Sequence, residues 1–93
     1  MLQASRPRAV IGEAAIINVA PHRAVAFSAL VSPGPGHLAC GLIFSPNLEL
    51  TPLATITLQL SCGEEVRLVV LLPAKASEWS FQTEGQAPEQ WRA

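Results

Sequence analysis

Proline recurs along the whole of this 93-residue sequence and leaves only short segments between its positions. The eight prolines are Pro7, Pro21, Pro33, Pro35, Pro46, Pro52, Pro73 and Pro88. Because proline has no backbone N–H and a fixed φ, it is excluded from helix interiors and from central strands. Most of the apolar segments between prolines run to about 7 to 12 residues, a length that suits strands better than helices. The spacing therefore predicts a fold built from short β-strands.

Six segments have the composition of strands, and several of them alternate with a period of two. They are residues 8–19, 22–31, 37–44, 53–60, 64–72 and 78–83. The period is clearest in 53–60, where Ile56, Leu58 and Leu60 would face a core and the residues between them would face water. Residues 8–19 also have some helix propensity, but the β-branched Ile16, Ile17 and Val19 favour a strand.

The same alternation predicts which residues of the other strands share a face. Val25, Phe27, Ala29 and Val31 would share one face, as would Leu38, Cys40, Leu42 and Phe44, and also Val66, Leu68, Val70 and Leu72. Loop signals at residues 34–36 (Gly-Pro-Gly) and around Gly63 predict that residues 22–44 and 53–72 each form a β-hairpin.

These segments predict an all-β fold, either a small antiparallel β-sandwich or a partly closed barrel of about six strands. The length allows one domain. We expect that domain to span residues 1–84 and residues 85–93 to be a polar C-terminal tail, in which Trp91 is the one large apolar side chain.

The charge content is low for so small a domain. Charged residues make up 14% of the chain and apolar residues 49%, whereas an ordinary domain has about 25% charged residues. This balance excludes a disordered chain, and no apolar run approaches the roughly 20 residues of a membrane-spanning helix. The N-terminus does not resemble a secretory signal. We therefore expect a cytoplasmic protein in which Cys40 and Cys62 are thiols.

The residue types that carry catalysis and metal binding are sparse. The chain has no aspartate, and adjacent strand residues such as Glu64 and Glu65 point to opposite faces, so they cannot act as an acid–base pair. The possible zinc ligands are His22, His37, Cys40 and Cys62, and they match no paired ligand spacing. The segment 34–39 (GPGHLA) is followed by a strand rather than by the helix of a dinucleotide-binding turn. The sequence predicts no enzyme, no metal and no cofactor.

Residues 40–72 resemble part of the PilZ domains, small bacterial barrels that bind cyclic di-GMP. The shared features are a Gly-Leu strand at Gly41 and Leu42 followed by an extended hairpin, with Arg6 and Arg8 placed before the first strand, where the family has its arginine motif. The likeness covers about a third of the chain. The ligand motifs themselves are absent, because Arg6-Pro7-Arg8 has a different spacing and residues 36–41 read GHLACG where the family has Asp-x-Ser-x-x-Gly. The resemblance implies at most a degenerate relative.

The segments 24–31 (AVAFSALV) and 66–72 (VRLVVLL) are apolar on both faces, which a small sheet with one wet face does not require. We therefore expect a non-catalytic protein–protein interaction module, acting as a subunit or docking domain of a larger assembly or as a homo-oligomer. The predicted contact residues are Trp79, Phe81 and Trp91, because tryptophan is enriched in interfaces. Trp79 and Phe81 could instead belong to the core.

An alternative hypothesis is a small-ligand-binding barrel that holds an anion with Arg6, Arg8 and Arg23. Nucleic acid is not an expected partner, because the six basic residues are offset by seven glutamates.

Overall fold

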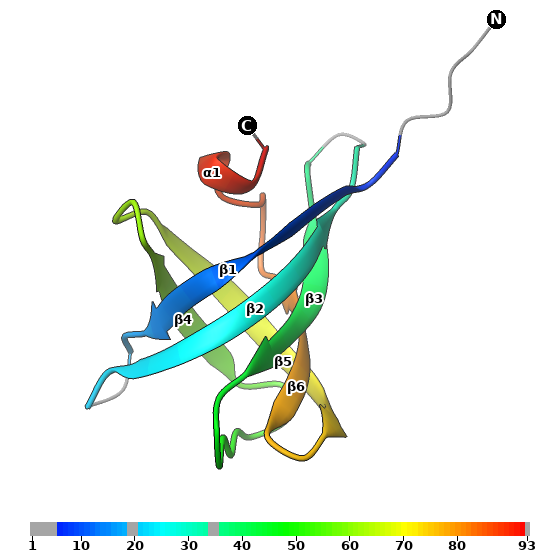
Figure 1. Ribbon diagram of the computed structural model, residues 1–93. Coiled ribbons are helices and arrows are strands. Elements are labelled where there is room, and N and C mark those ends of the chain that lie inside the picture. The colour runs from blue at the N-terminus through cyan, green and yellow to red at the C-terminus, as the bar shows by residue number, and fades with distance from the viewer. Residues whose placement is uncertain (1–5, 19–20, 34–35, 93) are drawn as a thin grey trace, which may run out of the picture.

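The computed structural model describes residues 6–18, 21–33 and 36–92 and contains six strands and one short helix (Figure 1). These elements are β1 (Arg8–Ile16), β2 (Arg23–Val31), β3 (Ala39–Phe44), β4 (Thr55–Leu60), β5 (Glu65–Lys75), β6 (Glu78–Thr83) and α1 (Glu89–Arg92). All six expected strands are present. The predicted first strand ends earlier than expected, at Ile16, and its last residue, Val19, lies outside the described residues.

The strands form a closed antiparallel barrel in the order β1-β2-β3-β6-β5-β4. The all-β prediction is confirmed, and of its two architectures the structure is the barrel. Both predicted hairpins are present, since β2 pairs with β3 and β4 pairs with β5. Closure of the sheet satisfies the backbone groups that an open edge would leave unpaired.

The barrel interior is filled by alternate side chains of every strand. The inward set predicted for β4 is confirmed, since Ile56, Leu58 and Leu60 are buried. The residues predicted to share one face of β2 also point inward and are buried: Val25, Phe27, Ala29 and Val31. On β5 the prediction holds for Val66, Leu68 and Val70. Leu72 is instead 67% exposed, because the register between β5 and β6 shifts between Val70 and Pro73 and ends the simple alternation.

The residues predicted to share one face of β3 lie on its outer face. Ala39 and Ile43 are buried, whereas Leu38, Cys40 and Phe44 are exposed. Strand β3 approaches β2 closely at Gly41, where an added Cβ would lie 1.9 Å from the carbonyl oxygen of Ser28. The smaller set of side chains therefore faces inward.

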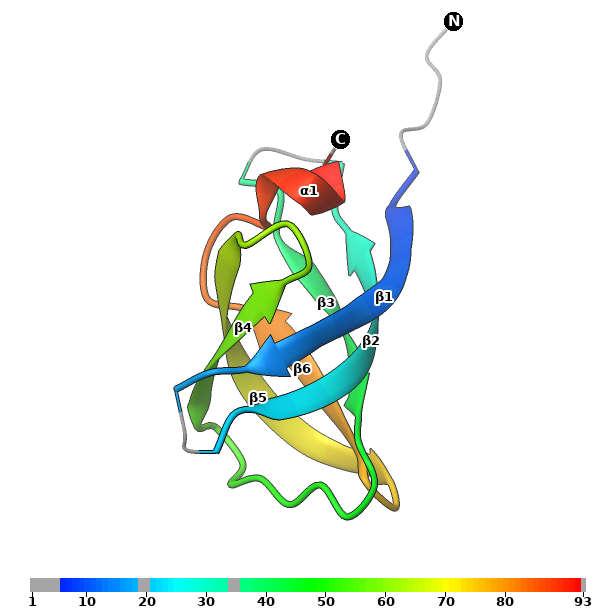
Figure 2. The ribbon, with the colours of Figure 1, turned by 60° about the vertical axis from the view of Figure 1, so that its left-hand side comes forward.

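Closure of the barrel is uneven at β1. This strand pairs with β2 along its whole length, but with β4 only through Ala14, Ala15 and Ile16. Helix α1 lies above the diverging strands at that end of the barrel (Figure 2), and Trp91 from α1 is 1% exposed. The segment expected to be a polar tail thus contributes Trp91 and Ala87 to the core of the domain.

The opposite end of the barrel is covered by the β3–β4 loop. Leu48 of this loop is buried, and its carbonyl oxygen accepts a hydrogen bond of 3.2 Å from Nε1 of Trp79. The guanidinium of Arg23 donates from Nε to Oγ of Ser45 over 3.2 Å and from Nη2 to the carbonyl oxygen of Pro46. These bonds hold the loop against β2 and β6.

Candidate interaction surface

The outward side chains of β1, β2 and β3 form one surface that we call the apolar face. Its members are Ala9, Ile11, Glu13 and Ala15 of β1, Ala24, Ala26, Ser28 and Leu30 of β2, and Cys40, Leu42 and Phe44 of β3. Each is exposed or half-buried, and each alternates with a residue that points into the barrel. Ile11 is 81% exposed, compared with 50% for Leu30 and 44% for Phe44.

The strand register arranges the apolar face in transverse rows. Ala9, Leu30 and Cys40 form the first row, and Ile11, Ser28 and Leu42 the second. Glu13, Ala26 and Phe44 form the third row, and Ala15 lies opposite Ala24 in the last. Side chains opposite one another on one face of an antiparallel pair are in contact range. The rows therefore make a continuous surface.

Charge is almost absent from this surface. Within the described parts of β1, β2 and β3, Glu13 is the one charged side chain among the four rows. On the other side of the barrel the outward residues of β4 are Thr55, Thr57 and Gln59. Arg67 of β5 lies opposite Thr57 and approaches Glu84 at 3.6 Å. The barrel is thus polar over β4 and over the start of β5, at Glu65 and Arg67, and apolar over β1, β2 and β3.

The apolar face also has an uneven relief. The first two rows hold the large side chains Ile11, Leu30 and Leu42, while the last row holds only Ala15 and Ala24. The surface is therefore raised at its first two rows and lowest at its last row, with Phe44 and Glu13 in the third row between them.

The three residues predicted from the sequence as partner contacts are all in the core. Trp79 is 9% exposed, and Phe81 and Trp91 are each 1% exposed. A partner could not reach these rings on the folded barrel, so the sequence-based choice of contact residues is corrected. The alternative expectation, that Trp79 and Phe81 belong to the core, agrees with their burial.

The three arginines proposed for an anionic ligand do not form one site. Arg8 lies opposite Val31 and Arg23 opposite Ile16, at the two ends of the β1–β2 pair. The two positions are eight residues apart along β1, which corresponds to about 26 Å. Arg23 lies beside a pocket of about 610 Å³ next to the β3–β4 loop, where Ser45 and Pro46 accept its hydrogen bonds. Arg6 precedes β1 and is exposed at the other end.

The remaining chemistry-bearing residues are dispersed. Cys40 lies on β3, and Cys62 lies in the β4–β5 turn with its Sγ 3.3 Å from Oε1 of Gln90. Both are free thiols. Within residues 6–18, 21–33 and 36–92, no three side chains of the metal-ligating types lie close enough together to hold a metal ion. In the same residues, no helix has the length and apolar character needed to cross a membrane.

Glu64 has a structural role that the sequence did not indicate. Its carboxylate accepts hydrogen bonds from the backbone N–H groups of Glu89, at 2.7 Å, and of Gln90, at 3.0 Å. The first N–H groups of a helix have no partner within the helix, and a carboxylate there satisfies them. The neighbouring Glu65 instead occupies the outer face of β5, opposite Gln59. Glu64 therefore stabilises α1, and Glu65 lies on the outer face of the barrel.

Comparison with known proteins gives no relative. The chain matches no protein-family model, no curated protein and no solved structure. The resemblance to PilZ domains accordingly rests on its strand residues alone.

Proposed function

We propose that this protein is a non-catalytic interaction module that packs its apolar face against the same face of a second copy. The observation that carries the proposal is the apolar face itself, three adjacent strands whose outward rows contain one charged residue, Glu13. Exposed apolar patches of this kind on small soluble domains are typical of protein interfaces. Burial would remove Ile11, Leu30 and Phe44 from water, and such removal contributes about 25 cal/mol per Å² of apolar surface.

The relief of the face favours a second copy as the partner. A two-fold axis brings the same patch of both copies together, so the surface has to be complementary to itself. Rotation about an axis that lies in the face, parallel to the rows and between the second and third of them, would lay Leu30 of the first row over Ala15 and Ala24 of the other copy. The same rotation would lay the row of Ile11 over the row of Phe44 and Glu13.

A non-catalytic role fits the dispersal of the cysteines and glutamates. Cys40, Cys62 and Glu64 lie on separate elements, and Glu64 is engaged by α1. The free state of both thiols is compatible with the reducing cytoplasm, which we infer to be the location of the protein.

The test is self-association of the purified chain and of two matched variants. Leu42→Glu places a carboxylate in the middle of the apolar face, whereas Thr57→Glu places one on the polar side, opposite Arg67. Sedimentation velocity from micromolar to millimolar concentration should give a dimer for the natural chain and for Thr57→Glu. The natural dimer would already hold the Glu13 carboxylate of each copy, and Leu42→Glu would add two more without a counter-charge, so it should weaken association by at least about tenfold.

Two results would overturn the proposal. One is a natural chain that sediments as a single particle at millimolar concentration and binds no hydrophobic dye. The other is a dimer whose dissociation constant is the same for Leu42→Glu and Thr57→Glu, since the interface would then lie elsewhere.

A further inference from the structure

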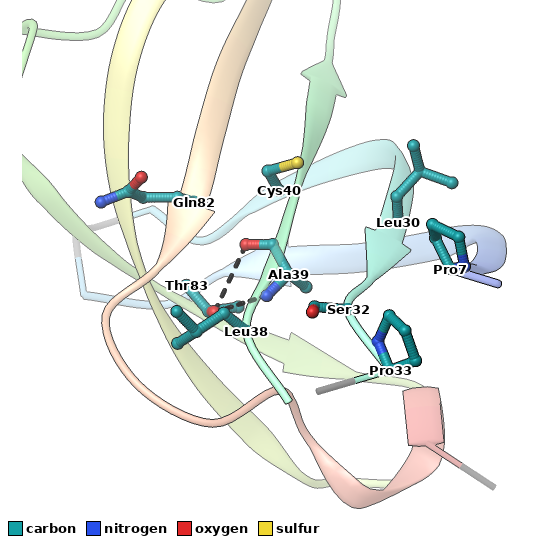
Figure 3. A pocket seen from close by; sticks show the side chains of 9 residues that line it. All are labelled: Pro7, Leu30, Ser32, Pro33, Leu38, Ala39, Cys40, Gln82 and Thr83. Carbon is teal, nitrogen blue, oxygen red and sulfur yellow. Dashed lines mark hydrogen bonds between the residues drawn. The ribbon is translucent and has the colours of Figure 1, made fainter. Parts of the chain in front are cut away.

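An apolar pocket opens at the end of the barrel where β1 begins and β2 ends. Its volume is about 350 Å³, and its walls include Pro7, Leu30, Pro33, Leu38, Cys40 and Gln82. In Figure 3, Leu30, Pro7 and Pro33 lie on one side and Leu38 and Gln82 on the other, with Cys40 between them. Pockets that bind small molecules typically measure about 300 to 1,000 Å³, so this pocket suits a compact ligand.

The frame of the pocket is held by buried hydrogen bonds. Oγ1 of Thr83 accepts from the backbone N–H of Ala39 over 3.0 Å and donates to the carbonyl oxygen of Ala39 over 3.3 Å (Figure 3). The backbone N–H of Ser32 donates to the carbonyl oxygen of Leu38 over 2.7 Å. Pro7 and Pro33 contribute rings with fixed φ. A site whose walls are already ordered loses little entropy when a ligand binds.

The walls themselves favour an uncharged ligand, because Arg6 and Arg8 flank Pro7 in the chain but are exposed and do not line the pocket. None of the described residues that line the pocket carries a charge, and transfer of an ion into such a site without a counter-charge is costly. The amide of Gln82 and the thiol of Cys40 are exposed at the walls and can bond to one polar group. We propose that this pocket binds an uncharged, compact apolar molecule, such as a fused aromatic ring system with a single hydroxyl group. This site goes beyond the proposed self-association.

The two free cysteines allow the proposal to be tested in a single reaction that contains its own control. Cys40 lines the pocket, whereas Cys62 lies in the β4–β5 turn and serves as the internal control. The probes are 1-naphthol, which is neutral at pH 7, and 1-naphthoate, which has a similar shape and a negative charge. Alkylation of each cysteine by iodoacetamide is followed by peptide mass spectrometry. The experiment uses a Leu42→Asn chain at low micromolar concentration, which weakens the self-association that would cover Cys40 and adds no charge beside the pocket.

At a concentration ten times its dissociation constant, 1-naphthol should slow the alkylation of Cys40 by about tenfold, as mass action requires. The alkylation of Cys62 should be unchanged, and 1-naphthoate should protect neither cysteine. Leu38→Glu, at a wall residue that is 55% exposed, should abolish the protection. Leu53→Glu, at a 74% exposed leucine outside the pocket, should leave it intact.

The proposal is overturned if 1-naphthol leaves the Cys40 rate unchanged up to its solubility limit. It is also overturned if 1-naphthoate protects Cys40 equally well, or if Leu38→Glu retains the protection. None of these results bears on self-association, because the face that mediates it is already disrupted in the chain used.

Discussion

The indole ring of Trp91 packs against the ring of Phe27, with the two centroids 5.0 Å apart and the planes tilted by 32°. Phe27 comes from the middle of β2 and Trp91 from α1. Their contact lies beside the stretch of β1 that has no pairing with β4. Helix α1 therefore completes the wall of the barrel where the strands separate.

Replacement of Trp91 by alanine should lower the free energy of unfolding by about 3 to 5 kcal/mol, because it leaves a cavity beneath β1. Urea denaturation followed by circular dichroism measures this loss. Trp91→Phe is the matched control and should lose much less, because a ring still packs on Phe27 and the buried Nε1, which has no hydrogen-bond partner among the described residues, is removed. An alanine variant as stable as the natural chain would show that α1 is dispensable for the barrel.

Loss of the Glu64 carboxylate should release α1. In Glu64→Ala the N–H groups of Glu89 and Gln90 lose their acceptor, and removal of such a cap costs about 0.5 to 2 kcal/mol. Amide hydrogen exchange at residues 89–91 should accelerate relative to the natural chain. Glu65→Ala removes an equal charge from the outer face of β5 and should leave these amides unchanged. Equal exchange in the two variants would contradict the capping role.

The alternation of apolar residues was sufficient to predict six strands, but it could not orient β3. In residues 37–44 both alternating sets of side chains are largely apolar, so either set could have faced the core. The orientation of β3 is decided by its close approach to β2 at Gly41, a tertiary contact that the alternation pattern does not reveal. Leu72 was misplaced for a similar reason, because the register shift beyond Val70 is set by the pairing of β5 with β6.

The sequence indicated the apolar face and misplaced its contact residues. The low charge and the apolar strand 22–31 correctly pointed to an uncovered sheet surface, since Ala24, Ala26 and Leu30 are exposed. Trp79, Phe81 and Trp91 were chosen for residue type, and type alone does not distinguish an interface tryptophan from a core tryptophan. The covering role of residues 85–92 depends on Glu64 and Phe27, which lie far from them in the chain.

The buried hydroxyl group of Thr83 should contribute more to the free energy of unfolding than an exposed threonine hydroxyl does. Thr83→Val keeps the shape of the side chain but leaves the N–H and carbonyl groups of Ala39 without the Oγ1 partner. Loss of hydrogen bonds to buried groups costs about 1 to 3 kcal/mol, measurable as a lower urea midpoint. Thr57→Val makes the same substitution on the outer face of β4, where the change should stay within about 0.5 kcal/mol. Equal midpoints for the two variants would contradict the assignment.

The approach of β3 to β2 at Gly41 predicts the most damaging small substitution in the barrel. A Cβ there would lie 1.9 Å from the Ser28 carbonyl oxygen and 2.8 Å from Cα of Ala29, so Gly41→Ala has to push two paired strands apart. Because backbone rather than a flexible side chain occupies the space, the loss of unfolding free energy should exceed about 3 kcal/mol. Gly85→Ala is the matched control, since nothing lies within 4 Å of its added Cβ. Chemical denaturation of both variants should leave Gly85→Ala within about 1 kcal/mol of the natural chain. A Gly41→Ala protein of natural stability would mean that β2 and β3 are farther apart than the described register allows.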